Sequence, residues 1–216
     1  MSVTLLIEQL LNGVQLGTML FLMASGLTLV FGVMGLINLA HGSFYMVGAY
    51  ATAAVTASTG SFLLGLAAGM TAAALVGALV ELLVIRRLYH RPHLDQVLAT
   101  FALILIFSEG TRWIFGSSPL WLSPPTWLTG FVTLPGDTRY PIYRLVLIGV
   151  GVAIAIALYL LISRTRLGMR IRAGESDREM IGALGVNIAK LYTVVFALGA
   201  ALAGLAGALV GALQSV

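Results

Sequence analysis

Long apolar runs without charges, separated by short polar stretches, dominate this sequence. Between Gln9 and Val80 there is no Asp, Glu, Lys or Arg. A helix that crosses a bilayer needs about 20 mostly apolar residues. The pattern therefore predicts an all-α fold, a polytopic transmembrane helical bundle with about six membrane segments. These segments lie near residues 10–33, 43–58, 62–85, 96–115, 142–163 and 190–213, with 43–58 the shortest, and polar loops remain at 86–95, 116–141 and 164–189.

The composition supports a membrane protein. Hydrophobic residues make up 59% of the chain and charged residues 9%, whereas a soluble domain carries about 25% charged residues. No Lys or Arg precedes the first apolar run, so the start lacks the basic region of a cleavable signal peptide, and the first segment is expected to remain as a span. Without cysteine, the chain offers no disulfide framework and no thiolate metal site.

The basic residues indicate the orientation. Nine of the twelve Lys and Arg residues fall in 86–95 and 164–190. Two spans separate these loops, so they lie on one side, which the positive-inside rule makes cytoplasmic. This placement accounts for the net charge of +4 without a nucleic-acid partner. Loop 116–141, whose Trp121, Trp127 and Tyr140 suit a membrane interface, then faces outward. The N-terminus lies outside if 43–58 crosses the membrane, and inside if it does not.

The stretch GLINLAHGSFYMVGAY, residues 35–50, places polar side chains inside the uncharged region. Asn38 and His41 are three positions apart and would share one face of a helix. Recurring glycines predict a broken or kinked segment whose polar groups face a cavity, as in the translocation sites of transporters. Alternatively, Asn38 and His41 satisfy each other and nearby carbonyls, and serve helix packing. The residues leave both interpretations open.

The last span carries small residues four apart on two adjacent ridges, which predicts close helix–helix contact. The ridges are Gly199, Ala203, Gly207 and Gly211, and Ala200, Gly204, Ala208 and Ala212.

The polar and charged motifs of the sequence do not indicate an enzyme. Glu109 with Arg112, and Glu81 with the arginines that follow it, are spaced as structural ion pairs. The sequence has no HExxH pair, no GxSxG elbow and no Walker lysine, since Lys190 is its only lysine. The chain is therefore expected to bind no metal and no cofactor, and another subunit would have to bind any nucleotide.

Loop 164–189 contains RIRAGESDREMIGALGVN, with charges of both signs. Its acidic residues precede the apolar Met180, Ile181 and Leu184, and Gly185 gives a C-terminal stop. This order predicts a short amphipathic helix outside the membrane, capped by Ser176 or Asp177. A solvated connector would explain the charges, but an exposed apolar face suggests a docking surface for a partner.

The same loop resembles the coupling loop of ABC-importer permeases, in which Glu-Ala-Ala is followed by Gly. Glu179 and Gly185 match that spacing, while Met180 and Ile181 replace the alanines. The longer run is similar to the branched-chain amino acid permeases of the LivH/LivM family, R-A-x-x-x-D-x-x-x-A-x-x-L-G-I/V-N. Ile181 again stands in place of an alanine, and the matching positions are Arg172, Ala173, Asp177, Leu184, Gly185, Val186 and Asn187.

A second motif, GLTLVFGVMGLINLAHGSFYMVGAY, is similar to the LivH-type signature of the same family. The resemblance implies one transmembrane permease domain over 1–216 of a bacterial ABC importer for branched-chain or related amino acids, in the inner (plasma) membrane. It also implies a LivM-like sister permease, two ATPase subunits that hold ATP and Mg, and an external substrate-binding protein. Family members continue beyond the end of this chain, so it is expected to be C-terminally incomplete.

The resemblance also assigns candidate residues. The translocation pathway or gate would involve Asn38, His41, Ser43 and Tyr45. The ATPase-coupling loop would involve Arg172, Glu175, Asp177, Glu179, Leu184 and Gly185. The alternative is an ATP-independent secondary transporter or channel for a small polar solute, which would need no docking partner at that loop.

Overall fold

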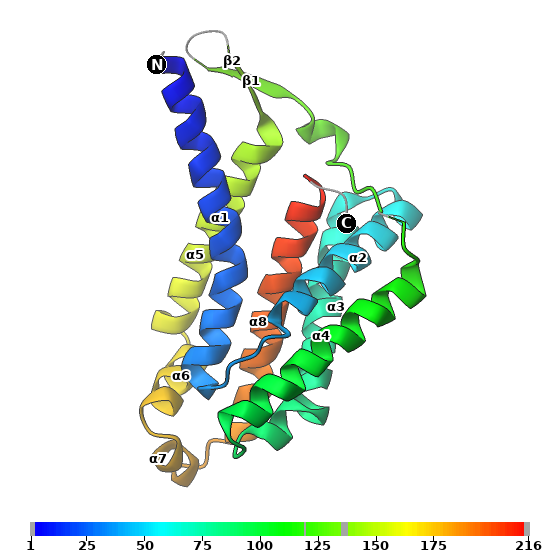
Figure 1. Ribbon diagram of the computed structural model, residues 1–216. Coiled ribbons are helices and arrows are strands. Elements are labelled where there is room, and N and C mark those ends of the chain that lie inside the picture. The colour runs from blue at the N-terminus through cyan, green and yellow to red at the C-terminus, as the bar shows by residue number, and fades with distance from the viewer. Residues whose placement is uncertain (1–2, 119, 135–137, 214–216) are drawn as a thin grey trace.

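The computed structural model describes residues 3–118, 120–134 and 138–213, and these form a helical bundle (Figure 1). Within them, five helices are long and apolar enough to cross a membrane. These are α1 (Val3–Met34), α3 (Phe62–Leu83), α4 (His93–Phe115), α5 (Ile142–Arg164) and α8 (Ile188–Gly211). A sixth membrane segment was expected at 43–58, where the structure has the shorter helix α2 (His41–Thr59).

Shorter elements join the long helices. A 3-10 turn, η1 (Ile85–Leu88), follows α3, and two helices, α6 (Arg166–Ser176) and α7 (Arg178–Ala183), lie between α5 and α8. Loop 116–141 contains η2 (Thr126–Leu128) and an antiparallel hairpin of β1 (Phe131–Leu134) and β2 (Thr138–Pro141). The fold is thus helical as predicted, with one small hairpin that the sequence pattern did not indicate.

Helix α8 occupies the middle of the bundle. It packs against α1, α2 and α3, while α5 lies beside α1 on one flank and α4 lies on the other (Figure 1). The start of α1 and the β-hairpin lie at one end, whereas α6, α7 and the start of α8 lie at the other. The basic loops lie at the end opposite the start of α1, so the orientation that the positive-inside rule predicts would put the start of α1 outside.

The small residues of α8 explain its central position. A Cβ at Gly204 would collide with Ala73 of α3, one at Gly207 with the main chain of Tyr45, and one at Gly199 with Val30 of α1. The predicted small-residue ridges are therefore confirmed as contact surfaces, and their partners are helices of the same chain. Close backbone approach of this kind provides the packing that holds helices together in lipid.

Candidate translocation and coupling site

The polar stretch 35–50 is a break between two helices. Helix α1 ends at Met34, and Gly35 follows with φ +64°, its N–H donating to the Phe31 carbonyl at 2.8 Å. Positive φ is a conformation that glycine adopts without steric cost and that commonly ends helices. Residues 35–40 are not helical, and α2 begins at His41. The predicted broken segment is confirmed.

Asn38 and His41 are both buried at this break, and each retains a polar atom without a partner. The Asn38 Oδ1 accepts a hydrogen bond from the Ala40 N–H at 3.0 Å, and the His41 ring bonds to the main chain of Met23. Among the described residues, neither Asn38 Nδ2 nor His41 Nε2 has a hydrogen-bond partner. The two side chains therefore do not satisfy each other, and the break holds free hydrogen-bonding capacity for water or a solute.

The four residues expected at a pathway or gate lie in the break and at the start of α2. His41 lies beside α1, next to Gly26, and its ring meets Phe44 edge-on with centroids 6.2 Å apart. Ser43 is buried, and half-buried Tyr45 lies against α8. His41 lies at the junction of α1, α2 and α8, because a Cβ at Gly26 would meet both the Gly199 carbonyl of α8 and the His41 ring. The part of these four residues in a translocation path stays a prediction.

The segment between α5 and α8 forms two helices, where one short helix was predicted. The Thr165 hydroxyl caps α6 by accepting a hydrogen bond from the Gly168 N–H at 3.0 Å. Thr165 is thus an N-cap that was not predicted from the sequence. Arg172 and Glu175 consequently lie on α6. They line a cavity of about 420 Å³ between α1, α5 and α6, and no residue of α7 lines this cavity.

Helix α7 matches the predicted short helix in its ends, but its exposed apolar face contains Met180 and Leu184 without Ile181, which is buried. The Asp177 Oδ1 accepts from the Met180 N–H at 2.9 Å, so Asp177 rather than Ser176 is the N-cap. Gly185, with φ +85°, follows its end. Met180 is 59% exposed and Leu184 76% exposed. Together with exposed Asp177 and Glu179, they form an apolar surface rimmed by charge.

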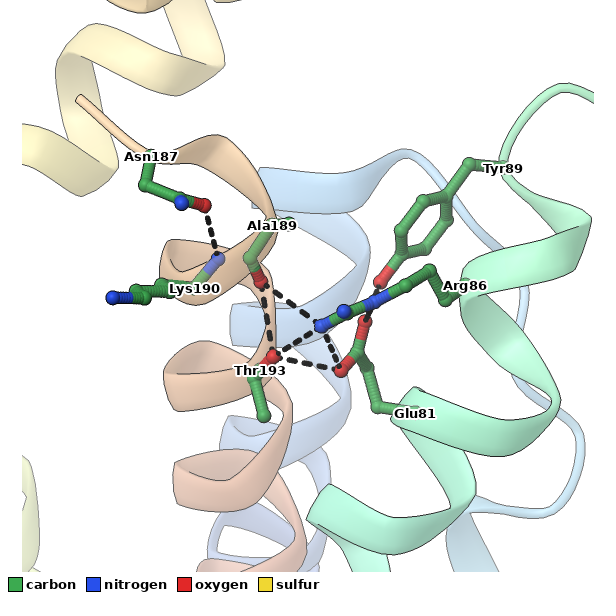
Figure 2. A network of polar contacts seen from close by, with 7 residues as sticks. All are labelled: Glu81, Arg86, Tyr89, Asn187, Ala189, Lys190 and Thr193. Carbon is green, nitrogen blue, oxygen red and sulfur yellow. Dashed lines mark hydrogen bonds and ion pairs between the residues drawn. The ribbon is translucent and has the colours of Figure 1, made fainter. Parts of the chain in front are cut away.

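A buried carboxylate fixes the start of α8 to the end of α3 (Figure 2). Glu81 is fully buried, and Arg86 donates to both of its oxygens, from Nε at 3.2 Å and from Nη2 at 3.1 Å. The Tyr89 hydroxyl donates to Glu81 at 2.5 Å and the Thr193 hydroxyl at 2.8 Å. The predicted ion pair of Glu81 is confirmed, with Arg86 as its partner. The contact with α8 was not foreseen.

The donors of this cluster are held in their protonated forms. The hydrogen bond to Glu81 raises the pKa of the Arg86 guanidinium. Burial, and then the hydrogen bond to Glu81, raise the pKa of the Tyr89 hydroxyl. Because both groups stay protonated at neutral pH, the carboxylate keeps its donors. On the same end of the bundle, Asn187 caps α8 by accepting from the Lys190 N–H at 3.0 Å.

The second predicted ion pair lies at the protein surface. Arg112 Nη1 is 3.2 Å from Glu109 Oε1, and both side chains are largely exposed. The spacing argument was correct, but this pair is peripheral to both the break and the α7 surface.

The five membrane-length apolar helices, with a polar break between α1 and α2 and the exposed helix α7 at the basic end, define a multi-pass membrane protein. Residues 9–216 match the family described as the permease component of branched-chain amino acid transport systems. The chain belongs to this family. Because the family supplies the permease rather than the ATPase, the expectation that the chain is a transport subunit and not an enzyme is confirmed.

Individual relatives cover nearly the whole chain. The chain is 30% identical to the high-affinity branched-chain amino acid permease LivH of Escherichia coli, over 97% of this chain and 72% of the relative. It is 28% identical to LivH of Salmonella typhimurium over 97% of this chain and 72% of the relative. It is 30% identical to BraD of Pseudomonas aeruginosa, over 95% of this chain and 70% of the relative. No solved structure matches.

Proposed function

We propose that the chain is the permease subunit of an ABC importer that moves branched-chain or related amino acids across the bacterial inner membrane. The observation that carries this proposal is α7, a capped helix with Met180 and Leu184 exposed at the basic end of the bundle. An apolar surface of this kind in water marks a docking site. Its position on the cytoplasmic side is where an ATPase would meet the permease.

The assembly proposed here has several parts. A LivM-like sister permease would complete the translocation path, and two ATPase subunits would dock at 172–187 and supply ATP and Mg. A substrate-binding protein would deliver the amino acid from outside. This chain would bind no cofactor itself. The names of the relatives support these partners, because each relative is a permease of a branched-chain amino acid transport system.

The break between α1 and α2 is proposed as part of the pathway or its gate. Asn38 and His41 leave buried polar atoms unpartnered at the junction of three helices. Leaving such atoms unsatisfied costs free energy unless water or a solute reaches them. ATP-driven movement at α7 would open and close this junction. A nucleotide state can shift the balance only through contacts that differ between the two states.

Purification from the native membrane tests the proposal directly. The expected result is a complex that contains two ATPase subunits and a sister permease. A homo-oligomer without an ATPase would instead support the ATP-independent transporter or channel.

Charge reversal at α7 provides a second test in reconstituted complexes. Asp177→Lys and Glu179→Lys should lose ATPase association and uptake while the bundle stays folded, and Glu175→Lys, on α6, tests whether docking extends beyond α7. A transporter without a docking partner would tolerate all three changes. Competition of uptake by leucine, urea and simple amides would then identify the class of solute.

A further inference from the structure

Arg178 joins the exposed helix α7 to the end of α1. It is the first residue of α7, and its Nη2 lies 3.5 Å from the main-chain oxygen of Val33, 145 positions earlier in the sequence. Its Cζ also lies 5.9 Å from the ring centroid of Tyr192 on α8. One side chain of the proposed docking helix thus contacts two helices of the bundle.

The end of α1 is a favourable place for a positive charge. The last carbonyls of a helix lack partners within the helix and carry partial negative charge. The last turn of α1 contains no basic residue of its own, so Arg178 supplies the cation from another element. At 3.5 Å the contact lies at the outer limit of a hydrogen bond, and its attraction comes mainly from charge acting on the helix end.

The helix end that Arg178 contacts is also the start of the polar break. Gly35, which ends α1, lies so close that a Cβ there would be 3.2 Å from Arg178 Nη2. The next residues lead to Asn38 and His41, whose unpartnered polar atoms define the proposed pathway junction. A displacement of α7 therefore moves the positive charge of Arg178 relative to the point where the break leaves α1.

Tyr192 on α8, the other neighbour of Arg178, is held in place. Tyr192 packs edge-on against Tyr89, with ring centroids 5.1 Å apart, and Tyr89 donates to the buried Glu81. The Glu81 cluster fixes this part of α8 to α3. Movement of α7 consequently shifts Arg178 relative to α1 more readily than it shifts α8 relative to α3.

We infer that Arg178 is a positioning residue for transport, which conveys the movement of α7 to the break between α1 and α2. This inference rests on the proposed function, because it takes the docking of an ATPase at α7 as the source of movement. Arg178 contacts neither solute nor nucleotide in this role. It couples two states of the break to two positions of α7.

Replacement of Arg178 in the assembled importer tests the inference. Arg178→Ala should retain ATP hydrolysis but lower uptake per ATP hydrolysed by about fivefold or more, the lower end of typical coupling between two sites. Arg178→Lys keeps the positive charge at the helix end and should restore much of the loss. Arg166→Ala is the matched control, because Arg166 is an exposed arginine of α6 with no hydrogen bond or ion pair to the described residues.

Two single-cysteine variants distinguish loss of the Arg178 link, between α7 and the break, from loss of ATPase docking at α7. The chain has no cysteine, so Ala183→Cys on α7 and Ile37→Cys in the break, both at exposed positions outside the residues named for docking or the pathway, can carry a fluorescent probe. In the unsubstituted background both probes should respond to ATPase subunits and ATP. With Arg178→Ala, the probe at 183 should still respond and the probe at 37 should not.

Other outcomes overturn specific steps. A probe at 37 that responds equally with Arg178→Ala overturns the proposed link between α7 and the break. A probe at 37 that is silent in the unsubstituted background while the probe at 183 responds overturns it as well. If both probes fail to respond with Arg178→Ala, Arg178 is part of the docking surface, and this result also overturns the proposed link between α7 and the break. Silence of the probe at 183 in the unsubstituted background overturns the proposed function itself.

Discussion

Glu81 on α3 and Thr193 on α8 share a hydrogen bond of 2.8 Å although they are 112 positions apart in the sequence. The Thr193 hydroxyl also accepts from Arg86 at 2.8 Å, so three elements meet at one carboxylate (Figure 2). A fully buried charge is tolerated here because it is paired and its oxygens are hydrogen-bonded. The cluster is therefore a fixed point next to the helix that is proposed to move.

Removal of this carboxylate should destabilise the bundle. Glu81→Ala leaves the donors of Arg86, Tyr89 and Thr193 without their acceptor. Breaking a buried pair costs about 3–5 kcal/mol, and we expect about 2–4 kcal/mol because the Arg86 side chain is 37% exposed and can be partly solvated. Thermal unfolding in detergent measures the loss. Glu109→Ala, which removes an exposed ion pair, is the control and should cost about 0–1 kcal/mol; equal losses for the two variants would contradict the prediction.

The Tyr89 hydroxyl gives the stability a distinct pH dependence. Its pKa in the folded protein is raised above the ordinary value of 10.0, first by burial and then by the hydrogen bond to Glu81. A raised pKa contributes stability that is fully present below the unfolded value and is lost as pH rises through the folded value. Thermal unfolding between pH 8 and 11.5 should therefore show an alkaline decline that begins near pH 10 and is smaller in Tyr89→Phe. An identical decline in the two proteins would exclude Tyr89 as its source.

Local signals allowed the break and the ends of α7 to be predicted from sequence. Glycine at 35 and 185 takes positive φ, and Asp177 caps α7, because these features depend on a few neighbouring residues. Helix α6 was missed because its charged sequence resembles a solvated loop, and only the Thr165 cap marks its start. The β-hairpin was missed because prolines around it favour irregular structure.

Tertiary contacts between distant segments could not be predicted in this way. The sequence spacing pairs Glu81 with the arginines that follow it, but nothing local indicates Thr193 as a further donor. Nor does any local pattern bring Arg178 to the end of α1. The Glu81–Thr193 contact follows from the central position of α8, which its small residues permit without specifying its partners. The Arg178 contact depends on where α7 lies relative to the end of α1.

A methyl group at Gly207 should disrupt that central packing. Its Cβ would collide with the Tyr45 main chain, which cannot move aside as a flexible side chain could. Overpacking typically costs about 1–3 kcal/mol and more against rigid neighbours. Gly207→Ala should therefore lower the thermal unfolding temperature or the yield of folded protein. Gly149→Ala is the matched control, because a Cβ at 149 meets open space. If both variants behave alike, α8 is not packed on α2 at this point.

The capping role of Asp177 can be separated from its charge. Asp177→Ala removes the acceptor for the Met180 N–H, and loss of an N-cap costs about 1 kcal/mol. In a helix of six residues this loss should weaken ATPase binding by about fivefold. Asp177→Asn keeps the cap without the charge and should bind nearly as well as the unsubstituted chain. Equal weakening in both variants would assign the effect to charge. Pull-down of the ATPase over a range of concentrations provides the measurement.

His41 should affect transport more than assembly. Its ring is buried beside α1 and makes one hydrogen bond, to the main chain of Met23, while Nε2 has no partner among the described residues, so alanine removes only that one bond from the fold. If the free nitrogen serves the pathway, His41→Ala should reduce uptake by about tenfold or more, equivalent to about 1.4 kcal/mol, while the yield of complex stays unchanged. His90→Ala, at an exposed loop position, is the control and should leave both unchanged. Normal uptake in His41→Ala, or failure of its complex to assemble, would make His41 a packing residue, and the pathway would then have to be sought elsewhere on the junction of α1, α2 and α8.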